Sequence, residues 1–199
     1  MARYHAIAAT SNAIRLLLEN ASATSEWAGH GFPLVQAEDL QKPLEGATKP
    51  KLSIFLYRVL LSTARRDRGP RLGPDGLHYR PSIPLDLHYL VTAWASEART
   101  AHQLLGWAIR VLDDTPVIPT GLLNAYQAGL TVFGPDETVE LVWNPLSLTD
   151  LSDLWQVASQ NQAPSACYIA RSVALDSDVA LDEGAPVSVR QFDYAKGPA

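Results

Sequence analysis

A strictly alternating segment followed at once by an amphipathic helical pattern constrains the fold more than any other feature of the sequence. Residues 84–95 (PLDLHYLVTAWA) alternate between apolar and mixed positions, and residues 98–113 repeat apolar side chains three and four positions apart. The first pattern is typical of a strand with one buried face and the second of a helix that packs on a sheet. The strand's apolar positions are Leu85, Leu87, Tyr89, Val91 and Ala93, opposite Asp86, His88 and Thr92.

Three further segments have the composition of strands. They are rich in β-branched, aromatic and leucine residues, and Gly, Pro or Asn residues punctuate the segments between them. In residues 51–61 apolar side chains occupy both faces, which predicts a central strand. The other two, with the side chains expected on their apolar faces, are residues 137–143 with Val139, Leu141 and Trp143, and residues 166–176 with Cys167, Ile169, Val173 and Leu175.

Helical periodicity and capping residues predict the remaining elements. Residues 4–19 form an amphipathic stripe, and Ser147 or Thr149 can cap a helix that runs to about Gln160. Residues 121–128 fit a short helix, and residues 32–36 a possible edge strand. The sequence therefore predicts an α+β single domain with a mostly antiparallel or mixed four-stranded sheet and helices packed on one face.

Two segments fall outside this regular pattern. Residues 62–84 carry many Arg, Gly and Pro residues and are predicted to be a long loop. After a body of residues 1–176, residues 177–199 are predicted to be a C-terminal arm, in which residues 186–192 (PVSVRQF) alternate weakly. Such an arm can pair with a sheet edge of its own or of a neighbouring subunit.

Charge and cysteine content exclude several classes of protein. The formal net charge is -5, which opposes general binding to nucleic acid or to an anionic membrane. No apolar run is long enough to span a bilayer, and the N-terminal residues lack the apolar core of a signal peptide. Cys167 is the only cysteine, so no intramolecular disulfide can form. We expect no nucleic acid and no membrane among the partners, and no export by the general secretory route.

Strong catalytic and cofactor motifs are absent from the sequence, and we expect no catalytic residues, cofactor or metal. The histidines have no metal-ligand spacing, and Cys167 falls on an inward-facing strand position. One weak candidate for a catalytic site remains. His88 and Asp86 share a strand face, where a carboxylate can orient an imidazole, so a small hydrolase or lyase stays open as the alternative function.

Five arginines in the predicted loop form the most unusual cluster. With Asp67 and Asp75 they give this segment a charge of +3, while the rest of the chain carries -8. Arginine favours planar, multidentate contacts with carboxylates or phosphates, so the cluster is a candidate partner-binding site, and an exposed solubilising loop is the alternative interpretation. The candidate residues are Arg65, Arg66, Arg68, Arg71 and Arg80.

Several ordered blocks resemble one known family. The LYR of residues 56–58, the LDLHYL of residues 85–90, the LLGWA of residues 104–108 and the DLW of residues 153–155 carry most of the likeness. Together, over roughly residues 5–176, they resemble the tail-terminator or cap proteins of extracellular contractile injection systems, which are phage-tail-like particles. No catalytic residues come with this resemblance.

The resemblance implies a structural assembly protein and not an enzyme. It implies a hexameric ring that closes the distal end of the inner tube and anchors the last layer of sheath, with inner-tube and sheath proteins as partners. Such a protein would be cytoplasmic during assembly and then part of the particle. An RNA-binding module is a third interpretation, but Tyr79 and Arg80 offer too few exposed aromatic and basic residues for it.

Overall fold

A six-stranded sheet runs through the computed structural model, which describes residues 4–41, 49–63, 69–73, 75–135, 137–158 and 162–181. The strand order is β1-β2-β5-β8-β7-β6, with β1 parallel to β2 and all other neighbours antiparallel. The strands are β1 (Leu34–Val35), β2 (Lys51–Leu61), β5 (Ile83–Trp94), β8 (Ser165–Leu175), β7 (Val139–Trp143) and β6 (Val117–Ile118).

The predicted α+β class and mixed sheet are confirmed, whereas the predicted number of strands is wrong. All four predicted strands are present, but β1 and β6 add a two-residue strand at each edge of the sheet. Two residues are too few to show a period of two, so sequence alone could not identify β6. The observed strand order also places β2 second from one edge of the sheet, whereas the sequence predicted a central strand there.

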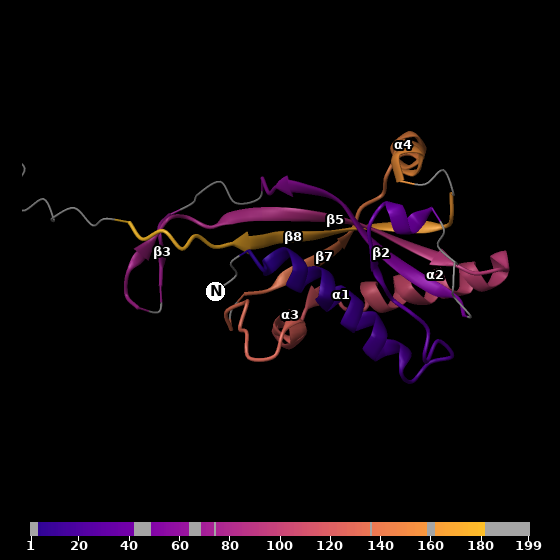
Figure 1. Ribbon diagram of the computed structural model, residues 1–199, viewed down its shortest axis with the longest axis horizontal. Helices are drawn as coiled ribbons and strands as arrows, with labels where there is room; N and C mark the ends of the chain where they lie inside the picture. The colour runs from indigo at the N-terminus through magenta and orange to yellow at the C-terminus, as the bar shows by residue number, and fades with distance from the viewer. Residues whose placement is uncertain are drawn as a thin grey trace, which may run out of the picture.

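Helices cover both faces of the sheet, so the predicted packing on one face is wrong. Figure 1 shows α4 on one side and α1, α2 and α3 on the other. Leu90 and Trp94 of β5 point towards α4, where Trp155 and Leu40 complete a second core. β5 is therefore buried on both faces. The helices are α1 (Ala6–Ser22), α2 (Ala98–Asp113), α3 (Thr120–Leu123) and α4 (Leu148–Ala158), with 3-10 turns η1 (Glu38–Leu40) and η2 (Asn124–Tyr126).

The predicted helices are confirmed in position. α2 has the predicted bounds, and its apolar stripe of Ala101, Leu104, Ala108 and Leu112 is buried. Ser147 is the N-terminal cap of α4, because its Oγ accepts the backbone N–H of Asp150 at 3.1 Å. The short helix expected at residues 121–128 is divided between α3 and η2.

A β-bulge in β8 reverses which of its side chains face α1. The register of β5 and β8 shifts between Leu85 and Leu87, and Ser172 has a φ of 54°. Before the bulge Tyr168 and Ala170 face α1, and after it Val173 does, while Cys167 points towards α4. The prediction that Cys167 and Val173 share a face is therefore wrong, because an extra residue changes the parity of a strand.

The segment predicted as a long loop contains a small hairpin. β3 (Arg71–Leu72) pairs with β4 (His78–Tyr79), and β5 already begins at Ile83. The start of the predicted arm joins this hairpin, because Ala180 forms an antiparallel bridge with Tyr79. The remainder of the predicted arm, residues 182–199, lies outside the described residues.

Candidate partner-binding surface

Towards the hairpin, the ends of the long strands form a projecting ribbon, which we define as residues 59–61, 83–87 and 170–175, although Leu87 and Val173 stay buried on the face towards α1. Figure 1 shows β5 and β8 running away from α2 towards β3. Apolar side chains are exposed here: Val59 at 42%, Leu61 at 52% and Ile83 at 43%. On the hairpin at the tip of the ribbon, Leu72 and Leu77 are also exposed. Apolar residues gathered at one end of a molecule are typical of a surface that binds another protein.

Sequence patterns alone did not identify this surface. The only signal was the uninterrupted run Val59-Leu60-Leu61 at the end of β2, where a half-buried strand would alternate. Trp143 is a related case, because the strand pattern places it inward although 46% of it is exposed. Its ring contacts Tyr168 edge-on at 5.4 Å, at the uncovered end of β7.

Arg71, one of the five candidate arginines, is held within the hairpin. Its Nε lies 3.6 Å from a carboxylate oxygen of Asp176, whose side chain is only 2% exposed. Its guanidinium also lies over the Tyr79 ring, 5.1 Å from the centroid. The other carboxylate oxygen of Asp176 accepts the Ser82 hydroxyl at 2.6 Å. Arg71 therefore joins the hairpin to the end of β8 and neutralises a buried carboxylate.

Of the other four candidate arginines, only Arg80 lies within the described residues. Arg80 is exposed, and its backbone N–H donates to the carbonyl of Val179 at 3.0 Å. Arg65, Arg66 and Arg68 lie outside the described residues. Of the five, Arg80 is thus the one whose described side chain is open to a partner.

The alternative pair, His88 and Asp86, is occupied by structural contacts. The Oδ1 of Asp86 accepts the backbone N–H of Ser172 at 2.9 Å and so stabilises the bulge in β8. His88 is buried beside the ring of Tyr57. Desolvation, together with the nearby charge of Arg58, lowers the pKa of His88 below its usual value. The carboxylate that was expected to orient His88 is therefore bound to the backbone of β8.

The lowered pKa of His88 makes stability depend on pH. The unfolded chain binds a proton at His88 near pH 6.5, whereas the folded chain resists it, so stability falls as pH drops below about 6.5. Between about pH 7 and pH 5, we expect the free energy of unfolding to fall less in His88→Phe than in the unchanged protein. Urea unfolding at both pH values measures this. His102→Phe, at an exposed position on α2, is the control and should match the unchanged protein.

Cys167 and the acidic residues do not form a reactive centre in the described part of the chain. Burial raises the pKa of the Cys167 thiol to about 11, so it is protonated at neutral pH. Among the described residues, no three His, Cys, Asp or Glu side chains gather as metal ligands would. None of the helices in the described ranges is long and apolar enough to cross a bilayer.

A family model identifies the chain. The model described as the Pvc16 N-terminal domain matches residues 9–189. The chain belongs to this family. That span covers the whole described sheet, the hairpin, α2 to α4 and all of α1 except its first three residues, so the Pvc16 N-terminal domain includes the projecting ribbon as well as the body. A search of the curated proteins found no match.

Two solved structures share the fold of this Pvc16 N-terminal domain. One is the PVC sheath/tube terminator of an extracellular contractile injection system in its extended state, with a TM-score of 0.62 and 17% identity over 96% of this chain and 64% of that one. The other is the tube terminating cap of the anti-feeding prophage, with a TM-score of 0.52 and 18% identity over 93% of this chain and 60% of that one. The chain thus spans less than two thirds of the length of each, and the resemblance to tail-terminator proteins is confirmed.

Proposed function

We propose that this protein is a structural assembly protein that closes the distal end of the inner tube of a contractile injection particle and anchors the last layer of sheath. The observation that carries the proposal is the fold that 96% of the chain shares with a sheath/tube terminator. The exposed apolar residues of the ribbon provide a surface for partners. In this proposal the partners are the inner-tube and sheath proteins, and the protein assembles in the cytoplasm before it becomes part of the particle.

The proposed assembly is a hexameric ring. A closed ring needs two different surfaces on each subunit that meet head to tail. The ribbon, with its exposed Val59 and Leu61, offers one such surface. In the proposed division of the chain, residues 1–176 form the body of each subunit and residues 177–199 form an arm.

A catalytic role has less support. Asp86 is bound to the backbone of Ser172, and burial keeps the neighbouring His88 from accepting a proton readily. The two solved structures described above are a terminator and a cap. The pair on which the hydrolase or lyase interpretation depended is therefore not arranged as a carboxylate that orients an imidazole.

Light scattering coupled to size exclusion, with and without the purified inner-tube protein, tests the proposal. A six-fold mass, or a complex that forms only with tubes, is expected. A monomer or dimer that ignores tubes would contradict it. Tube length, measured by electron microscopy during assembly, gives a second readout, because tubes should stop growing only when the protein is present.

We further propose that the arginine cluster, with Arg65, Arg66, Arg68 and Arg80, contacts acidic surfaces of the tube or sheath. Reversing Arg65, Arg66 and Arg68 to Glu should give tubes of uncontrolled length or detached sheath, because attraction becomes repulsion. Arg80→Glu alone should weaken binding to tubes by roughly tenfold, with a steep salt dependence. Arg99→Glu, at an exposed position on α2 distant from the ribbon, is the matched control. Normal particles from the triple variant would contradict the role of the cluster.

A further inference from the structure

The end of β2 is an open sheet edge. β1 pairs with β2 only at Ile54 and Phe55, and a bridge joins Gly31 to Lys51. From Leu56 to Leu61, no described residue pairs with the side of β2 that faces away from β5. The exposed side chains there include Val59, Leu60 and Leu61. An apolar strand edge of this length is a template for another strand.

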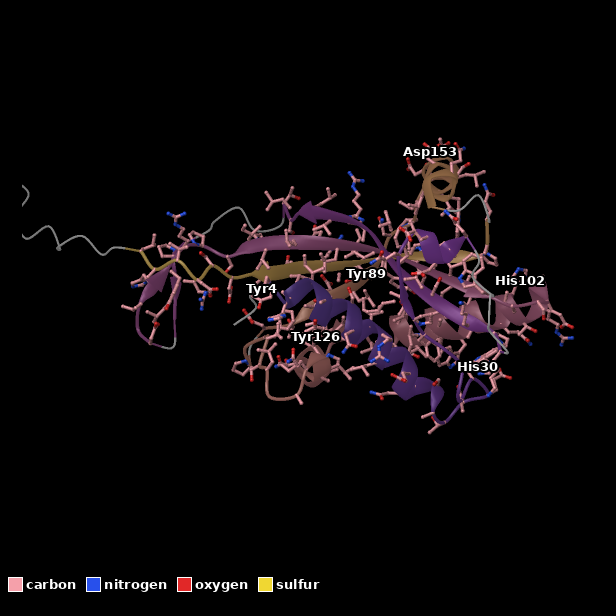
Figure 2. All side chains as sticks on the ribbon, in the orientation of Figure 1. Tyr4, His30, Tyr89, His102, Tyr126 and Asp153 are labelled. Atoms are coloured by element: carbon pink, nitrogen blue, oxygen red, sulfur yellow. The ribbon has the colours of Figure 1, made fainter. Side chains whose placement is uncertain are left out.

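Two pockets lie against this edge, one on each face of the sheet. The first, of about 400 Å³, is mainly apolar and is lined by Leu34, Leu56, Tyr89 and Tyr126 among others. The second, of about 420 Å³, is lined by Tyr57, Arg58, His88, Asp150 and Asp153 among others. Figure 2 shows Tyr126 and Asp153 on opposite sides of the sheet, near α1 and on α4. A strand added to β2 would place alternate side chains in these two pockets.

We propose that residues 186–192 of a second copy of this chain add to the edge of β2 between Leu56 and Leu61. In this segment Val187 and Val189 share one face, and Ser188 and Arg190 share the other. The two valines suit the apolar pocket. Arg190 suits the opposite pocket, where the carboxylates of Asp150 and Asp153 outnumber the guanidinium of Arg58.

The chain cannot reach its own edge with this segment. Val173 pairs with Leu85, and Leu85 pairs with Leu61, so Val173 and Leu61 lie at the same position along the strands. Ala180 pairs with Tyr79 of the hairpin, beyond the end of the ribbon (Figure 1). The eight residues from Val173 to Leu181 therefore carry the chain roughly 26 Å away from Leu61. The next five residues, to Pro186, span at most about 18 Å. Pairing must therefore occur between copies, head to tail, as ring closure requires.

This inference rests on the proposed function only in that a ring brings the copies together. Variants of the full chain that each add one cysteine to the buried Cys167 test it. Isotope-labelled Val59→Cys is mixed with unlabelled Val189→Cys, oxidised mildly with and without inner-tube protein, and analysed by mass spectrometry. The mixed-label disulfide dimer is expected at roughly tenfold the yield of a matched mixture of Val117→Cys with Val189→Cys. Val117 is a comparably exposed valine on β6, at the opposite edge of the sheet.

A mixed dimer that is absent, or no more abundant than in the Val117 mixture, would overturn the inference. Val59→Lys gives a second measurement without cysteine chemistry, because a lysine on an open edge opposes strand addition. It should lower the self-association constant by about tenfold or more, whereas Val117→Lys, at the opposite edge of the sheet, should not. Equal association of both variants would also overturn it. Tube binding is scored separately by co-sedimentation, so failure of capping and failure of strand exchange are distinguished.

Discussion

Replacing Trp155 with alanine is expected to lower the free energy of unfolding by about 3 to 5 kcal/mol. Trp155 is 1% exposed and is the largest fully buried side chain of α4. Its ring meets Trp94 edge-on at 5.8 Å and completes the small core that also contains Leu40, Leu90 and Cys167. Alanine leaves a cavity between α4 and the sheet that so few neighbours cannot fill. Urea denaturation followed by far-UV circular dichroism measures the loss.

Trp143 provides the matched control for this prediction. It also makes an edge-on aromatic contact, with Tyr168, but 46% of its surface is exposed. We therefore expect Trp143→Ala to cost no more than about 1.5 kcal/mol, the value of an aromatic pair without much burial. Equal losses from the two variants would show that α4 is not held by its core, and the packing described on this face would be wrong.

Replacing Arg71 with methionine should release the hairpin from the end of β8 while the rest of the protein stays folded. Methionine keeps the apolar length of the side chain but leaves the carboxylate of Asp176 buried without this cation. Because the Arg71 side chain is 21% exposed, solvent screening limits the expected cost to about 2 kcal/mol, or roughly thirtyfold in local opening.

Amide hydrogen exchange reports this release directly. The N–H of Arg80 donates to Val179, and the N–H of Leu181 donates to His78, so both bonds join the hairpin to the segment after β8. We expect faster exchange at these two amides and unchanged exchange in β5. Arg80→Met is the control, because the exposed Arg80 side chain should not hold the hairpin. Unchanged exchange in Arg71→Met would leave Arg71 available as a partner contact and would contradict the structural role assigned to it.

The proposed strand addition and the proposed capping depend on different residues of this protein. The proposed strand exchange between copies uses the backbone edge of β2 and its two pockets, whereas the proposed tube and sheath contacts use the arginine cluster. Variants at Val59 and at Arg80 should therefore fail in different assays, the first in self-association and the second in tube binding. This separation allows the two proposals to be judged independently.

The local elements of this protein are determined by its sequence. The bounds of α2 and β2 and the cap of α4 follow from short-range periodicity and capping, which depend on neighbours three or four residues away. The α+β class follows from the same patterns. The ordered sequence blocks also pointed to the terminator family, which the family model confirmed.

Only the tertiary structure decided which faces are covered, where the bulges lie and which edge stays open. The bulge at Ser172 depends on Asp86, 86 positions earlier in the chain, so no local pattern could place it. The second core depends on Trp94 and Trp155 meeting across the sheet. The sequence predicted that Arg71 binds another protein, because the carboxylate that it contacts within the chain, Asp176, is distant in the sequence. Contacts between distant residues carry no periodic signal, and such contacts determine where this protein leaves an edge and a ribbon exposed.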